Sequence, residues 1–245
     1  MKKTVLFAAV VLFVLSAGSH SFGQDTVRSP GQHPQSLEKT VTKTVRIKYL
    51  LYLPEGYENG DKKWPLMLFL HGAGERGDDL ELVKMHGPPK LVAEGQSFPF
   101  IIVSPQCPEN SWWTYEMETL VLLLDEIATQ YRVDRKRVYL TGLSMGGYGT
   151  WSLATRYPER FAAIAPICGD GTPYLAHRLK DVPAWVFHGA KDEVVSIRNS
   201  EDMVAAIRKN KGSARYTMYP NYGHNSWTQT YKNPELYKWF LSQSR

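Results

Sequence analysis

Short apolar runs recur along this chain, with longer amphipathic stretches between them. The runs predict buried strands and cover residues 66–70, 100–103, 138–140, 161–167, 184–187 and 214–219. The stretches between them predict helices and cover residues 116–131, 148–157, 196–210 and 233–242. Strands that alternate with helices predict a mainly parallel sheet, joined by right-handed crossovers and covered by helices.

The first part of the chain is less regular. Residues 40–53 are rich in Val, Ile, Tyr and Thr, which predicts two strands or one long hairpin. With these, the sheet is expected to have about eight strands. Residues 80–94 are expected to be helical in part, with a break at Gly87-Pro88-Pro89.

The amino terminus has the pattern of a secretory signal peptide. Lys2 and Lys3 precede an apolar run over residues 5–15, and small residues follow to Gly23. We expect residues 1–23 to be cleaved, residues 24–37 to be a flexible leader, and residues 38–245 to form one domain. The run is too short for a membrane anchor, so a periplasmic or secreted bacterial protein is expected.

Charge and cysteine content exclude some classes of protein. The formal charge is +5 and loses Lys2 and Lys3 with the signal peptide, so it is too small and too scattered for a nucleic-acid-binding surface. No Cys and His residues have the spacing of metal ligands, and no cofactor motif is present. Cys107 and Cys168 are either free thiols or a disulfide, since an exported protein permits both.

One of the predicted strands leads into a nucleophile motif. Residues 142–146 read Gly-Leu-Ser-Met-Gly, which fits G-x-S-x-G, and they lie between a strand and a helix. That context predicts a nucleophile elbow, in which Ser144 has a strained backbone and the flanking glycines leave room for the turn. A chance match is the alternative, because a pattern with three fixed positions is common.

A serine hydroxyl needs a base and an acid, which follow the serine in elbow enzymes in the order acid, then histidine. Of the later histidines, His177 is in a polar segment and His188 precedes the acid, whereas His224 follows the last strand. His224 is therefore the expected base. Asp192, after the strand 184–187, is the expected acid, with Asp170 as its competitor.

A glycine-rich loop over residues 71–77, His-Gly-Ala-Gly-Glu-Arg-Gly, follows the strand 66–70. No Gly-Lys-Ser/Thr follows it, so a nucleotide site is not expected. In an elbow protein, such a loop presents a backbone N–H to the developing oxyanion. The expected donors are the amides of Ala73 and Met145.

These motifs, with Trp112-Trp113, His188 to Asp192 and Gly223 to Trp227, resemble the α/β-hydrolase superfamily. More narrowly, the chain is similar to small secreted esterases known as predicted peptidases, feruloyl esterases or phospholipase/carboxylesterase-like proteins. The resemblance covers roughly residues 40–240 and implies an α/β-hydrolase fold without a substantial lid. It implies Ser144, Asp192 and His224 as a catalytic triad.

The resemblance also suggests that Trp113, Tyr148 and Trp227 lie near the cleft and bind substrate. From the residues alone, Trp112 and Trp113 form either a platform for a ring or, in at least one case, a cap over the core.

The expected function is a secreted carboxylic ester hydrolase that needs no cofactor. Its substrate is expected to be a small-molecule or polysaccharide-linked ester, such as a feruloyl or acetyl ester of plant polysaccharide. A generic short-chain carboxylesterase, a serine peptidase with the same triad and a non-catalytic binding module are the alternatives. Neither the oligomeric state nor the acyl group follows from the residues.

Overall fold

The structure is a computed structural model and describes residue 30 and residues 32–245. The expected signal peptide, 1–23, lies outside the described residues, as does part of the expected leader. Residues 32–43 belong to a separate unit, are exposed and contain no helix or strand.

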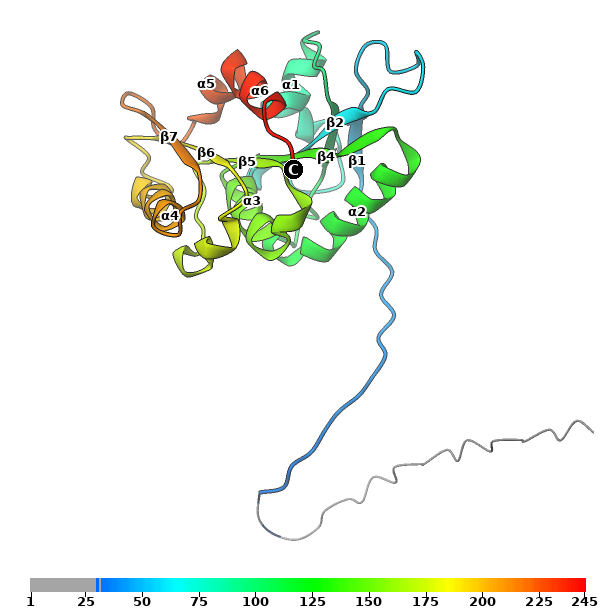
Figure 1. Cartoon of the computed structure of the whole chain (residues 1–245), viewed down its shortest axis with the longest axis vertical. Helices are drawn as coiled ribbons and strands as arrows, with labels where there is room; N and C mark the ends of the chain where they lie inside the picture. The colour runs from blue at the N-terminus through cyan, green and yellow to red at the C-terminus, as the bar shows by residue number, and fades with distance from the viewer. Residues whose placement is uncertain (1–29, 31) are drawn as a thin grey trace, which may run out of the picture. The chain divides into compact units, whose positions relative to one another are not determined.

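Residues 44–245 form one unit around a seven-stranded sheet (Figure 1). The strand order is β1-β3-β2-β4-β5-β6-β7, and every neighbouring pair is parallel except β1 with β3. The strands are β1 (Tyr49–Tyr52), β2 (Trp64–Leu70), β3 (Ile101–Pro105), β4 (Val133–Leu143), β5 (Ala163–Ile167), β6 (Ala184–Gly189) and β7 (Ala214–Tyr219). The prediction of a mainly parallel sheet is confirmed.

Helices cover both faces of the sheet (Figure 1). Each face has its own apolar core. On one face are α2 (Met117–Gln130), α3 (Met145–Arg156) and α4 (Ile197–Lys209), and on the other are α1 (Gly87–Ala93), α5 (Trp227–Lys232) and α6 (Pro234–Leu241). All seven residues of β2 are buried, as their unbroken apolar run predicted. Among the described residues, no helix is both long and apolar enough to span a membrane.

Of two predictions for the first part of the domain, one is wrong and one is confirmed. Residues 40–53 form one short strand, β1, at the edge of the sheet, so the described sheet has seven strands rather than about eight. Residues 80–94 are helical in part, as predicted: the 3-10 helix η2 (Leu82–Met85) and α1 are separated at His86, and the prolines at 88 and 89 occupy the first turn of α1. Proline is tolerated there because the first helical amides have no intrahelical partner.

Candidate active site

The expected elbow is present where β4 ends and α3 begins. Ser144 has a φ of 52° and caps α3, so the residue is held in a conformation that L-residues rarely adopt. A Cβ on Gly146 would overlap the carbonyl oxygen of Leu70, and one on Gly142 would overlap the carbonyl of Gly146. The two glycines are therefore required by close backbone approach, and this turn raises the serine hydroxyl above the strand ends.

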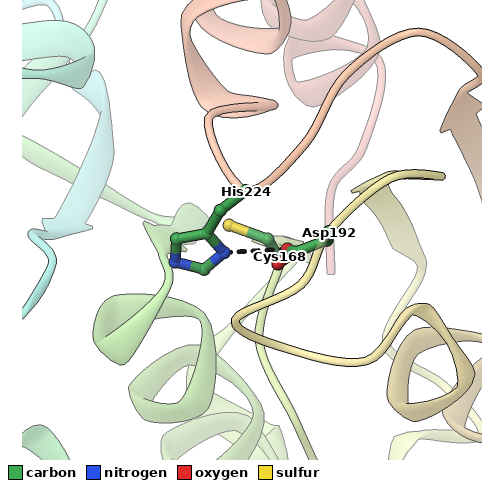
Figure 2. A group of neighbouring side chains, drawn as sticks. All are labelled: Cys168, Asp192 and His224. Carbon is green, nitrogen blue, oxygen red and sulfur yellow. Dashed lines mark hydrogen bonds and ion pairs between the residues drawn. The ribbon is translucent and has the colours of Figure 1, made fainter.

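His224 lies in the loop after β7, within hydrogen-bond distance of Ser144. Its Nε2 is 2.9 Å from Ser144 Oγ. Its Nδ1 is 2.8 Å from Asp192 Oδ2, and Figure 2 draws this hydrogen bond as a dashed line. A carboxylate can only accept, so Nδ1 carries the proton and Nε2 is free to accept from the serine hydroxyl. The imidazole thus has the tautomer that a general base needs.

The Asp192 side chain has no exposed surface and accepts three hydrogen bonds. Its Oδ1 accepts from the amides of Val194 and Val195, both at 2.9 Å. Its Oδ2 accepts from His224 and lies 3.1 Å from His188 Nε2. Burial opposes ionisation, but the hydrogen bonds from Val195, His224 and Val194 outweigh it and hold the pKa of Asp192 below its usual range. The carboxylate is therefore charged and held in place at neutral pH.

The competing residues lie elsewhere. His188 is fully buried and orders the acid's loop, with Nδ1 2.7 Å from Ser200 Oγ and Nε2 2.9 Å from the Val195 carbonyl. His177 is exposed. Asp170 is half-buried, and burial, followed by the charge of Asp202, raises the pKa of its carboxyl. The carboxylate that pairs with His224 is that of Asp192.

The glycine-rich loop has its carbonyl groups occupied by side chains. His71 Nε2 accepts from the Cys107 amide at 3.0 Å, so Nδ1 carries the proton and donates to the Gly72 carbonyl at 2.6 Å. Burial lowers the pKa of His71 to about 4, so the ring is neutral. The Nε of Arg76 donates to the Ala73 carbonyl at 3.0 Å. The carbonyls of Gly72 and Ala73 thus accept hydrogen bonds from side chains, and the amide of Ala73 stays available as a donor.

Each expected oxyanion donor is the first residue of a helix. Ala73 begins the 3-10 helix η1 (Ala73–Glu75), and Met145 begins α3, so neither amide has a partner within its own helix. Their role in catalysis remains a prediction. The sequence did not single out Arg76 as the residue that orients this loop, although its place in the glycine-rich motif was a signal.

Trp113 does not line a cleft, contrary to expectation. It is completely buried, and its Nε1 donates to the His71 carbonyl at 2.9 Å, so it supports the glycine-rich loop from inside the core. Trp112 is the exposed member of the pair, with 42% of its surface accessible. Trp113 therefore caps the core, whereas a platform formed by Trp112 stays a prediction.

Tyr148 and Trp227 lie close to the three side chains. The Tyr148 amide donates to the Ser144 carbonyl at 3.1 Å, and burial followed by the charges of Asp170 and Asp192 raises the pKa of its hydroxyl. The ring of Trp227 is 5.2 Å from that of His224 and nearly perpendicular to it. Contact of either residue with a substrate stays a prediction.

Cys168 is a neighbour that the sequence did not reveal. Its backbone has a φ of 41°, and its sulfur lies within 4.8 Å of the His224 and Asp192 ligand atoms (Figure 2). Burial raises the pKa of the thiol to about 12, and His224 and Asp192 already bond each other. Although these three could ligate a metal ion, we therefore interpret Cys168 as a neutral packing residue. Both cysteines are free and buried, because they follow β3 and β5, which are not neighbours in the sheet.

The chain is similar in sequence to known hydrolases and esterases. The sequence pattern of the dienelactone hydrolase family matches residues 113–235. The bifunctional acetylxylan esterase/xylanase XynS20E of Neocallimastix patriciarum is 27% identical over 71% of this chain, which spans 26% of that protein. A protein of Aspergillus flavus named "Probable feruloyl esterase C" is 25% identical over 94% of this chain and 84% of its own length.

Solved structures show the same fold. A thermostable esterase is 38% identical to this chain, with a TM-score of 0.73, over 82% of this chain and 60% of the other. A ferulic acid esterase at 21% identity, with a TM-score of 0.60, shows the fold alone.

A parallel sheet, with Ser144 in an elbow and Asp192 and His224 at later strand ends, defines the class of α/β-hydrolases. Within that class, the chain belongs to the dienelactone hydrolase family. The expected fold class is therefore confirmed, and no inserted lid is evident within residues 44–245.

Proposed function

We propose that this protein is a secreted serine carboxylic ester hydrolase that acts through an acyl-enzyme formed on Ser144. The observation that carries the proposal is the unbroken hydrogen-bond chain from Ser144 Oγ through the His224 ring to Asp192, with distances of 2.9 and 2.8 Å. A nucleophile, a base and an orienting acid in hydrogen-bond contact are the signature of activated nucleophilic catalysis.

The reaction follows from these contacts. Ser144 Oγ attacks the ester carbonyl carbon while His224 Nε2 takes the hydroxyl proton, and Asp192 stabilises the imidazolium that forms. The carbonyl oxygen becomes negative and accepts from the amides of Ala73 and Met145. The C–O bond to the alcohol then breaks, and the alcohol leaves with the proton from His224. Water, activated by the same base, hydrolyses the acyl-enzyme and releases the acid.

For the substrate, we propose feruloyl or acetyl esters carried by plant polysaccharide. The relatives named acetylxylan esterase and feruloyl esterase support this choice. The exposed Trp112 supports it as well, because an indole face suits stacking against a sugar or phenolic ring. The site has no evident lid within residues 44–245, so an ester on a bulky polymer has access.

Covalent labelling tests the nucleophile without knowledge of the substrate. A fluorophosphonate probe is expected to label the wild type once, and Ser144→Ala is expected to lose the label. The matched control is Ser152→Ala, a half-buried serine on the same helix, α3, that is expected to label as the wild type does. Labelling that survives in Ser144→Ala refutes the assignment.

A panel of methyl ferulate, acetylated xylan, p-nitrophenyl acetate and a peptide amide tests the substrate class. The proposal expects ester cleavage, with methyl ferulate or acetylated xylan preferred over p-nitrophenyl acetate. Turnover of short generic esters alone removes the polysaccharide part. Cleavage of the amide in preference to all esters makes the protein a serine peptidase instead.

Export is supported by the amino-terminal pattern and by a relative named an uncharacterized secreted protein from Arthroderma benhamiae, 24% identical to this chain. Intact mass of the protein recovered outside the cytoplasm tests it. A mature chain that begins near residue 24 is expected, and a mass that retains Met1 to Gly23 contradicts the proposal.

A further inference from the structure

A buried carboxylate lies beside the glycine-rich loop and takes no part in the reaction described above. Glu75 is 8% exposed, and its Oε2 is buried without a hydrogen-bond partner among the described residues. Burial raises the pKa of Glu75, although the charge of His86 acts in the opposite direction. A buried carboxylate with an unpaired oxygen lowers the stability of the fold, which suggests that Glu75 has a functional role.

Two imidazole rings lie beside the Glu75 carboxylate. The carboxylate lies 3.8 Å from both His71 Nδ1 and His86 Nε2. His71 is neutral and donates its Nδ1 proton to the Gly72 carbonyl, whereas the His86 side chain is 30% exposed. The contact that leads from Glu75 out of the glycine-rich loop is therefore with His86.

His86 is the extended residue between η2 (Leu82–Met85) and α1. The next residue, Gly87, has a φ of 66°, and a Cβ there would be 2.5 Å from the Phe69 ring. Only glycine permits that conformation at that distance from the ring. The chain therefore turns at a fixed point, which directs the His86 ring toward both Glu75 and α5.

From His86 the contacts continue to the base. The His86 ring is 5.4 Å from the ring of Trp227, which in turn is 5.2 Å from the ring of His224. The four side chains form a continuous row from the glycine-rich loop to the histidine loop. The row joins the loop after β2, in the middle of the sheet, to the loop after β7, at its edge.

We propose that Glu75 is a positioning residue for the base, acting through His86 and Trp227 on the orientation of the His224 imidazole. The inference rests on the proposed function. The carboxylate fixes the His86 ring, the His86 ring fixes the indole, and the indole limits rotation of the imidazole between Ser144 and Asp192. Orientation of a general base matters in the transition state more than in substrate binding, so the effect falls on kcat.

A double-mutant cycle distinguishes this role from simple support of the loop. Glu75→Gln keeps the shape and removes the charge. Trp227→Phe shortens the ring row and removes no hydrogen bond, since Trp227 Nε1 has no partner among the described residues. With p-nitrophenyl acetate, we expect each variant to lower kcat about tenfold with KM within about twofold. The double variant is expected to fall no further than the worse single variant.

The control is Glu94→Gln, which removes a carboxylate that lines the same small pocket between α1 and α5 as Trp227 does. Glu94 is exposed and lies outside the row, so this variant is expected to keep the wild-type kcat. Should Glu75→Gln fail to fold, His86→Gln takes its place in the cycle, because His86 is partly exposed. Effects that multiply in the cycle, or a kcat within twofold of the wild type, overturn the inference.

Fluorophosphonate labelling separates this inference from the proposed function. If wild-type Ser144 is not labelled, the proposed function fails. If the wild type is labelled and Glu75→Gln is labelled at the same rate, the function stands and the positioning role of Glu75 is refuted. The inference expects labelling of Glu75→Gln to slow in proportion to its loss of kcat.

Discussion

Replacing Asp192 by asparagine tests the centre of the proposed mechanism. Each carboxylate oxygen faces two donors, with the Val194 and Val195 amides at Oδ1 and the His224 and His188 rings at Oδ2. The NH₂ group of asparagine cannot accept a hydrogen bond. The donors at whichever position it occupies, either the two backbone amides or the imidazoles, therefore lose their acceptor. A backbone amide always carries its proton, whereas an imidazole can move its proton from one ring nitrogen to the other. The amide oxygen is therefore expected to face the backbone and the NH₂ group the histidines.

An asparagine whose NH₂ group faces His224 forces the imidazole into its other tautomer. Nδ1 then accepts from the asparagine, and Nε2 carries a proton toward Ser144, so the ring cannot take the hydroxyl proton. The expected loss in kcat is on the order of 10⁴, the magnitude seen when a triad carboxylate is made neutral. Loss of charge-assisted hydrogen bonds in a side chain without exposed surface is expected to cost about 3 kcal/mol of stability.

The stability effect has a defined dependence on pH. Because the folded-state pKa of Asp192 is below its unfolded value, the carboxylate contributes stability at pH values above about 4. This contribution is lost as pH falls through the folded-state pKa. The difference in unfolding free energy between wild type and Asp192→Asn is therefore expected to be full at pH 7 and to shrink below pH of about 4.

The assays are hydrolysis of p-nitrophenyl acetate and thermal unfolding at pH 7. A loss of about 3 kcal/mol corresponds to a fall in Tm of roughly 6–12 °C for a chain of this size. Asp170→Asn is the control and is expected to keep kcat within about threefold of the wild type, because its carboxyl does not bond His224. If Asp192→Asn keeps more than about a tenth of the activity, or Asp170→Asn loses as much, the reasoning is wrong.

Three further outcomes are expected. Gly146→Ala places a Cβ on the Leu70 carbonyl and is expected to lose more than about 3 kcal/mol of stability, measured by urea unfolding; wild-type stability contradicts the elbow geometry. Trp113→Phe removes the donor to the His71 carbonyl and is expected to lower kcat while KM stays constant, whereas a rise in KM alone makes Trp113 a substrate contact. Because burial raises the pKa of Cys168 to about 12, a disulfide reagent at pH 8 is expected to modify it only after unfolding; fast modification of the native protein refutes this.

Local sequence was sufficient for the elbow and for the order of the site residues. Gly142, Ser144 and Gly146 lie in a strand–turn–helix context, and that context depends on neighbours in the chain. The fully apolar run of β2 likewise predicted a central strand, because only a strand covered on both faces buries every side chain. His224 followed from its place after the last strand.

Tertiary packing decided which neighbours touch, and adjacent residues of one type show this most clearly. Trp112 and Trp113 have the same side chain, but the indole N–H of one meets the buried His71 carbonyl while the other is exposed. The prolines after Gly87 begin a helix because that glycine fits against Phe69, a residue eighteen positions earlier. The row from Glu75 to His224 joins loops far apart in the chain.

The sequence by itself thus determined the chain order of a serine, an acid and a histidine, each placed after a strand of a parallel sheet. Only the tertiary structure decided that Trp113 is core, that Cys168 lies beside Asp192, and that His86 lies between Glu75 and Trp227. The physical reason is that periodicity and turn chemistry act between near neighbours in the chain. Burial and hydrogen bonding of a given side chain depend on which distant segments close over it.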